Sequence, residues 1–141
     1  MRKLFIAAFM FVSSFGSNVM ADGHSIKMGI ILGFTGPIES LTPAMAASAE
    51  LAFKEASDSG SLLGGKSIEV IRADSTCVDA AAATSAAERL ITSDKIKAIV
   101  GADCSGVTTA ILQNVAMANG VVMISPSATS PALSDLSLIH I

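Results

Sequence analysis

Short apolar runs alternate along the chain with longer segments in which apolar residues recur every three or four positions. The runs, typical of strands, cover residues 27–33, 67–73, 97–101 and 121–124. The spacing between them predicts helices from 42 to a glycine-rich stop at 60–65, from 79 onward, and over 105–119. Three strand–helix repeats closed by a fourth strand predict an α/β fold, with a parallel sheet covered by helices on both faces.

The predicted helices begin at residues suited to capping. Thr42 is expected to cap the first helix, with Pro43 at its first position, and Asp79 to cap the second. Each helix also has an apolar face that is expected to point inward. These faces are Met45, Ala49, Ala52, Phe53 and Ala56; Ala83, Ala87, Leu90 and Ile91; and Val107, Ile111, Val115 and Ala118.

The first 21 residues have the layout of a secretory signal peptide. A basic start at residues 1–3 precedes an apolar run over 4–12, and small residues end the segment at Ala21. A membrane anchor is the alternative, but this run is too short to cross a hydrocarbon core about 30 Å thick. Asp22, which follows, is not a cysteine that could carry a lipid. We therefore expect cleavage after Ala21 and export of the rest of the chain.

The composition after residue 21 limits the choice of partner. This part has 120 residues, enough for one domain, with seven Lys and Arg against twelve Asp and Glu. Nucleic acid is not expected as a partner, because phosphate backbones are bound by clustered basic surfaces. The absence of Trp and Tyr also removes most platforms for base stacking.

The only two cysteines, Cys77 and Cys104, both lie in the part expected to be exported. In an oxidising compartment such a pair favours a disulfide, and two free thiols are the alternative. A metal site is disfavoured because there is no CxxC motif and His24 and His140 are remote in sequence. No metal and no cofactor are expected.

Three loops should form the functional edge of the sheet. Ligands of open parallel sheets bind outside the carboxyl ends of the strands, which selects the loops 33–37, 102–106 and 125–129. All three are rich in glycine and small hydroxyl residues, and we expect them on one rim. Asp74 and Asp79, near this edge, are interpreted as solvated caps.

Ser105 is the leading candidate for ligand binding in these loops. It lies at a strand-to-helix junction, where free backbone N–H groups and a hydroxyl favour an anion such as a carboxylate. The alternative is that Ser105 serves only as a helix N-cap. Ser127 and Thr129 have a similar double interpretation, as turn residues or as groups presented to a polar ligand.

An enzyme is not expected. The Cys104-Ser105 pair on such a turn is similar to a nucleophile elbow, and a small hydrolase using Cys104 is one alternative function. However, the Gly-x-Ser-x-Gly pattern is absent, and no histidine falls near a rim loop to act as a base. Dinucleotide and phosphate-loop fingerprints are absent as well.

Three stretches carry a family resemblance: IKMGIILGFTGP at 26–37, KIKAIVGADCSG at 95–106 and VVMISPSATSPAL at 121–133. The chain resembles the N-terminal lobe of the periplasmic solute-binding proteins that deliver branched-chain and hydrophobic amino acids to ABC importers. The resemblance covers nearly all of residues 26–136. It implies a type I periplasmic binding fold, flavodoxin-like in this lobe, and the Cys77–Cys104 bridge.

The resemblance also implies site residues and partners. In that family two lobes close over one amino acid by hinge bending. Ser105 and Thr129 would hold the α-carboxylate, Ser127 and Ala128 would line the pocket, and Leu41 would flank the ligand. A branched-chain or other hydrophobic amino acid is the expected ligand, and a related amide or small organic acid is the alternative. A periplasmic monomer and the membrane permease of an ABC importer as partner are expected.

Residues 22–136 are thus expected to form the first lobe. The tail 137–141 does not resemble the family continuation, which suggests a truncation. The ligand-sensing domain of a receptor or signalling protein can share this lobe and is the second alternative function.

Overall fold

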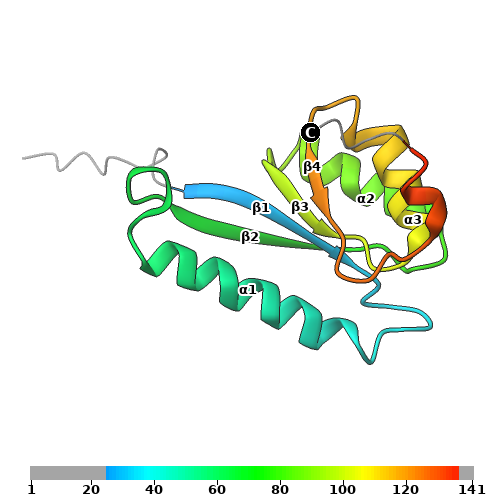
Figure 1. The fold of residues 1–141 in the computed structure, drawn as a ribbon, viewed down its shortest axis with the longest axis horizontal. Coiled ribbons are helices and arrows are strands. Elements are labelled where there is room, and N and C mark those ends of the chain that lie inside the picture. Colours follow the sequence, from blue (N-terminus) through cyan, green and yellow to red (C-terminus); the bar gives the residue numbers. More distant parts are fainter. Residues whose placement is uncertain (1–24, 137–141) are drawn as a thin grey trace, which may run out of the picture.

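The computed structural model describes residues 25–136. In chain order (Figure 1), the elements are β1 (Ser25–Leu32), α1 (Thr42–Asp58), β2 (Ser67–Asp74), α2 (Ala80–Thr92), β3 (Ala98–Gly101), α3 (Ser105–Ile111) and β4 (Val122–Ile124). Short 3-10 turns lie at Leu62–Gly64 and Pro131–Leu133, and a π-helical turn at Leu112–Ala116 follows α3. The signal peptide predicted at 1–21 and the tail 137–141 lie outside the described residues. Within 25–136, no helix is long and apolar enough to cross a membrane.

The four strands form one parallel sheet in the order β2-β1-β3-β4. β1 pairs with β2 along its whole length, from Ser25 opposite Ser67 to Leu32 opposite Asp74. α1 covers one face of the sheet, and α2 and α3 cover the other (Figure 1). The predicted α/β architecture, with a parallel sheet and helices on both faces, is confirmed.

Each face of the sheet has its own apolar core. The larger core joins α2 and α3 to the sheet around Ile31, Leu90 and Ile99. The smaller one joins α1 to β1 through Ile30, Leu32 and Ala46. The inward face predicted for the second helix is confirmed, since all four residues are buried. These are Ala83, Ala87, Leu90 and Ile91.

The apolar face of α1 is largely the one predicted, since Met45, Ala49 and Phe53 pack on the sheet, but Ala52 lies outside it and Ala46 is at its centre. Ala46 is fully buried, whereas Ala52, which was expected to point inward, is exposed. The helix packs on the sheet through Met45, Ala49 and Phe53 around Ala46. Ala52 lies six positions after Ala46, about 120° away around the helix axis, and therefore off the packed stripe.

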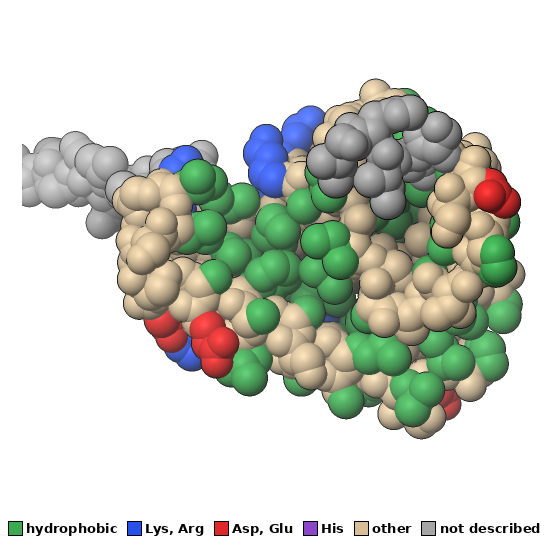
Figure 2. Space-filling view, in the orientation of Figure 1, with side chains coloured by type: hydrophobic (Ala, Val, Ile, Leu, Met, Phe, Trp, Pro, Cys, Tyr) green, Lys and Arg blue, Asp and Glu red, His purple; other side chains and the backbone are tan. Residues whose placement is uncertain are grey.

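β4 leaves part of one sheet face uncovered. Val122 and Ile124 alternate with Met123, which packs on the α2–α3 side. They therefore point to the face that α1 covers over β1 and β2, and they are 63% and 67% exposed. Figure 2 shows hydrophobic side chains gathered beside α1 on this side of the molecule.

Thr42 does not cap the first helix, which corrects the prediction. Leu41 is at the N-cap position, with no side-chain hydrogen bond, and Thr42 is the first residue of α1. The Thr42 hydroxyl is buried and donates to the Gly33 carbonyl oxygen at 3.1 Å, so it fastens the helix start to the loop after β1. The cap predicted at Asp79 is confirmed, because its carboxylate accepts from the N–H groups of Ala81 and Ala82.

The third predicted helix changes its winding after Ile111. The Met117 N–H bonds the Leu112 carbonyl five residues back at 3.0 Å, the pattern of a π turn. Each π-type bond encloses one more residue than an α-helical one, which shifts the side-chain positions that follow. As a result Ala116 is fully buried, whereas Ala118, predicted to be inward, is exposed.

Replacing each of these two alanines by leucine tests this change in which side chains are buried. Ala116→Leu is expected to lower the free energy of unfolding by about 1–3 kcal/mol, because the added atoms enter a filled core. Ala118→Leu, two residues away, should change it by less than about 0.5 kcal/mol, since the side chain stays in solvent. Urea unfolding followed by circular dichroism measures both. Equal effects of the two substitutions would mean that the π turn is absent in solution.

Candidate functional site

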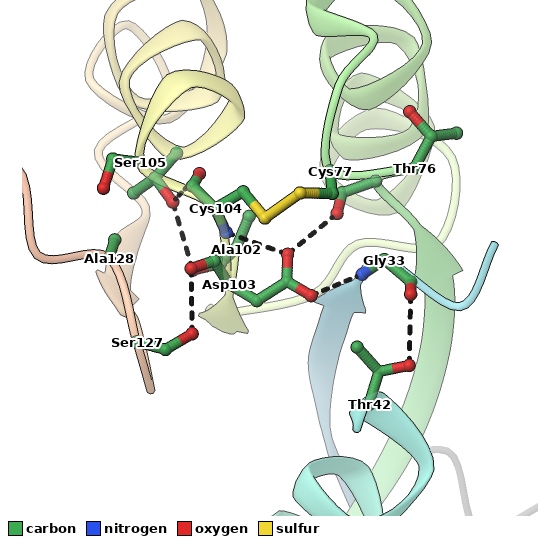
Figure 3. The surroundings of a disulfide bond; sticks show 12 residues. Gly33, Thr42, Thr76, Cys77, Ala102, Asp103, Cys104, Ser105, Ser127 and Ala128 are labelled. Carbon is green, nitrogen blue, oxygen red and sulfur yellow. Dashed lines mark hydrogen bonds between the residues drawn. A yellow bond between two sulfur atoms is a disulfide. The ribbon is translucent and has the colours of Figure 1, made fainter. Parts of the chain in front are cut away.

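The loops after all four strands meet along one rim of the sheet. The loop after β1 bonds the loop after β3 through the Gly33 N–H and the Asp103 carboxylate, at 2.7 Å. The loop after β4 bonds the same β3 loop through the Ser127 hydroxyl and the Asp103 carbonyl oxygen, at 2.8 Å. Figure 3 shows these groups converging from separate strands. The prediction that the three loops share one rim is confirmed.

Asp103 is at the centre of the rim and was not singled out from the sequence. Its side chain is 3% exposed. One carboxylate oxygen accepts from Gly33 N–H, and the other accepts from the Ser75 hydroxyl at 3.3 Å and the Cys104 N–H at 2.9 Å. Asp103 therefore joins the loops after β1, β2 and β3. Its one sequence signal is its position directly after a buried strand, which many solvated acids share.

A disulfide links two of these loops. Cys77 and Cys104 are bonded with their Cα atoms 5.2 Å apart, which confirms the predicted bridge. Gly33 fits against it closely, since a Cβ at that position would lie 3.2 Å from the Cys77 Cβ. With Cys104 held in the bridge, the sulfur is not a free thiolate, so the arrangement does not support the hydrolase alternative.

Ser105 is not the N-cap of α3, which removes one of its two interpretations. Cys104 occupies that position, without a side-chain cap bond, and Ser105 is the first helical residue. The Ser105 hydroxyl oxygen instead accepts from the backbone N–H groups of Thr129 and Ser130, both at 3.1 Å. Within residues 25–136 its hydroxyl hydrogen has no acceptor, and neither has that of Thr129. Two hydroxyl donors thus remain available on adjoining loops.

In the last rim loop, Ser125 makes the side-chain hydrogen bonds that hold the turn. Its hydroxyl oxygen accepts from Ala128 N–H at 2.9 Å, and its hydroxyl hydrogen is donated to the Ala102 carbonyl. Ser127 does not bond its own turn through its side chain but reaches across to Asp103. Ser127 and Ala128 are therefore held on the β3 side of the rim (Figure 3). Thr129 is held beside Ser105 by its N–H bond to the Ser105 hydroxyl.

Leu41 lies on the other side of the rim. It immediately precedes α1, and its side chain is 56% exposed. The Thr42 bond to Gly33 holds this segment to the loop after β1. A ligand-flanking role for Leu41 stays a prediction.

Asp74 ties the β1 and β2 loops together at the edge of the rim. Its carboxylate accepts from the Thr35 hydroxyl at 2.6 Å and from the Thr76 N–H at 2.8 Å. Burial raises the pKa of this carboxyl, but the bonds from Thr35, Thr76 and the Phe34 N–H together outweigh burial, so the pKa lies below its ordinary value. Asp74 is thus a link between loops, not a helix cap.

This depressed pKa predicts an acid-dependent contribution to stability. The contribution is present above the ordinary pKa of an unfolded aspartate, about 3.9, and is lost as the pH falls through the lower folded value. Asp74→Asn should therefore be less stable than the parent at about pH 7, and the difference should shrink below about pH 4. Thermal unfolding across this range measures the gap. A gap that stays constant with pH would contradict the assignment.

A second carboxylate with a lowered pKa joins α1 to β2. Arg72 donates two hydrogen bonds to Glu50, at 2.6 and 2.7 Å, and these bonds lower the pKa of Glu50. The Arg72 guanidinium also lies 5.6 Å from the centre of the Phe34 ring. The pair is exposed, so it positions α1 more than it stabilises the fold.

Comparison with known proteins identifies the family of this chain. The sequence profile of a family described as periplasmic binding protein matches residues 25–139. A Leu/Ile/Val-binding protein homolog of Brucella abortus is 33% identical over 140 residues, covering 98% of this chain and 36% of the relative. The Leu/Ile/Val-binding protein BraC3 of Rhizobium johnstonii is 30% identical over 116 residues, covering 82% of this chain and 30% of the relative.

Solved structures of substrate-binding proteins also match this chain. The branched-chain amino acid transporter substrate-binding protein LivJ of Streptococcus pneumoniae, in complex with isoleucine, matches with a TM-score of 0.71 and 36% identity, over 79% of this chain and 31% of that one. An ABC transporter substrate-binding protein of Desulfitobacterium hafniense, in complex with leucine, matches with a TM-score of 0.69 and 25% identity, over 81% and 32%. The chain spans about a third of the length of these proteins. By its sequence and its fold, the chain belongs to the periplasmic binding protein family.

Proposed function

We propose that this chain supplies one lobe of the substrate-binding component of an ABC importer, which captures a branched-chain or other hydrophobic amino acid. The observation that carries the proposal is the pair of unengaged hydroxyl donors, Ser105 and Thr129, on adjoining rim loops. Relatives of this fold are described in complex with isoleucine and with leucine. The rim supplies the polar half of a site for such ligands.

The roles follow from the hydrogen bonds. A ligand α-carboxylate would accept from the hydroxyls of Ser105 and Thr129, whose relative position is held because Ser105 accepts from Thr129 N–H at 3.1 Å. Such charge-assisted hydrogen bonds are stronger than neutral ones. Ser127 and Ala128 would line the pocket, and Leu41 would contact the apolar side chain. None of these groups forms a nucleophile–base pair, which agrees with a binding role.

The remainder of the proposed function concerns closure of the site, export and delivery of the ligand. The relatives are about three times as long, so a second lobe would close over the rim by hinge bending and complete the site. We infer that the loaded protein is a periplasmic monomer that delivers its ligand to the membrane permease of the importer. Export would follow from cleavage after Ala21.

Ser105→Ala in the full-length protein tests the site. Loss of a hydrogen bond to a charged carboxylate is expected to weaken leucine, isoleucine or valine binding about ten- to hundredfold. Isothermal titration with each amino acid measures the change. Ser48→Ala is the matched control, because Ser48 is exposed and its hydroxyl donates to the Ala44 carbonyl within α1. An Ser105→Ala variant that keeps the parent's affinity would overturn the carboxylate site.

A further inference from the structure

We propose a second binding site, for a phosphate-bearing anion, at the edge of the sheet opposite the rim. A hollow of about 360 Å³ lies at the amino ends of β1, β2 and β3. The residues that line it are Ser25, Ile26, Lys27, Lys66, Lys95 and Lys97. The strands are parallel, so this hollow and the amino-acid rim lie at opposite ends of the sheet.

The distribution of cations carries the proposal. After residue 21 the chain has seven Lys and Arg, and four of them line this one hollow. The other three all form ion pairs: Lys54 with Asp58, Arg72 with Glu50, and Arg89 with Asp94. Within the described part of the chain, none of the four hollow lysines has a carboxylate partner. The unpaired positive charge of a net acidic chain is therefore concentrated at one place.

The backbone keeps the four lysines together. Lys97 N–H donates to the Lys27 carbonyl at 2.8 Å, which joins the starts of β3 and β1. Lys66 directly precedes the Ser67 that pairs with Ser25. Lys95 has a left-handed backbone (φ 62°) and leads into Ile96, which is buried in the core. The backbones of these lysines are thus held at or just before the starts of three strands.

The nearby acids in the part of the chain that the structure describes do not neutralise this charge. Asp94 adjoins Lys95 but is bonded to Arg89 at 2.6 Å. Glu69 is the register partner of Lys27, yet no ion pair joins them. Four ammonium groups around one hollow repel one another, and a multivalent anion between them would relieve that repulsion. The site should therefore favour an anion carrying two or more charges.

The donor set points to phosphate. Lysine is a compact point charge that binds phosphate oxygens without fixed geometry, and the Ser25 hydroxyl adds a donor. Among the described residues, the lining has no arginine fork for a planar carboxylate and no aromatic ring for a base. A hollow of about 360 Å³ suits a small molecule. A soluble phosphate compound and a phospholipid headgroup share this chemistry.

Titration with inorganic pyrophosphate tests the site. Binding to the full chain is followed by calorimetry at fixed ionic strength, with sodium chloride as the monovalent control. K95Q/K97Q should weaken pyrophosphate binding by at least about tenfold, because two of the four charges are removed. K54Q is the matched control, since Lys54 pairs with Asp58 away from the hollow, and it should bind as the parent does. Binding of the parent should also weaken as salt is raised.

A second arm identifies the source of the phosphate. Sedimentation with vesicles of phosphatidic acid and phosphatidylcholine, against phosphatidylcholine alone, reports a headgroup site if K95Q/K97Q abolishes the phosphatidic-acid-dependent fraction, since the phosphomonoester of phosphatidic acid can carry two charges. Binding to pyrophosphate but not to vesicles assigns a soluble ligand, and both results support the phosphate site. The proposal is overturned if neither probe binds, or if K95Q/K97Q and K54Q bind equally.

Discussion

Replacing Cys77 and Cys104 by serine is expected to lower the free energy of unfolding by about 3–4 kcal/mol. The bridge joins residues 27 positions apart and so restricts a loop of the unfolded chain that contains all of α2 and β3. In the chain-entropy model, a loop of this length accounts for the whole estimate. The loss is a large fraction of the stability of a small domain.

The measurement is urea unfolding followed by far-ultraviolet circular dichroism, because the chain has no Trp or Tyr to report by fluorescence. Reductant should lower the midpoint of the parent to that of C77S/C104S and leave the variant unchanged. Amino-acid binding by the full-length variant should also weaken, because Cys104 directly precedes Ser105. If reductant leaves the parent's midpoint unchanged, the bridge does not stabilise the fold.

The architecture could be predicted because its determinants are local. Apolar runs such as 27–33 have the length and bounds of buried strands, and Asp79 caps a helix through the N–H groups next to it. Parallel pairing then follows from the alternation, and the shared rim follows from parallel pairing. The disulfide could be predicted from the cysteine pair, because the predicted signal peptide implies an oxidising compartment.

The features that sequence reasoning missed depend on contacts between distant residues. Thr42 has the composition of a cap, but its hydroxyl bonds Gly33, nine positions earlier and in another element. The π turn moves Ala118 into solvent and Ala116 into the core, although helical periodicity alone predicts the opposite for Ala118. In both cases tertiary packing decides between local alternatives of similar energy.

The clustering of lysines around the hollow could not be predicted from the charge count either. A count of seven cations against twelve anions describes a weakly acidic chain and gives no sign of clustering. Lys27, Lys66, Lys95 and Lys97 are dispersed over three segments of the sequence and meet because three parallel strands begin side by side. Composition therefore determines the net charge of the protein, whereas the topology determines where its charged residues cluster.

Asp103→Asn is expected to lower the free energy of unfolding by about 2–4 kcal/mol and to weaken amino-acid binding by the full-length protein. Both carboxylate oxygens of Asp103 accept from backbone N–H groups, one from Gly33 and the other from Cys104. An amide offers only one acceptor oxygen, so its NH₂ group would face one of these N–H donors and leave it unpaired. In a site that is 3% exposed, water does not readily replace the lost bond.

Asp79→Asn is the matched control. The Asp79 carboxylate accepts from Ala81 and Ala82 through a single oxygen, which asparagine retains, and asparagine caps helices about as well as aspartate. The same chemical change should therefore cost almost nothing at Asp79 and several kcal/mol at Asp103. Equal losses at the two positions would show that Asp103 does not join the rim loops. A loss confined to Asp103, with weaker amino-acid binding, would mean that one buried carboxylate positions Ser105 and its neighbours for the ligand.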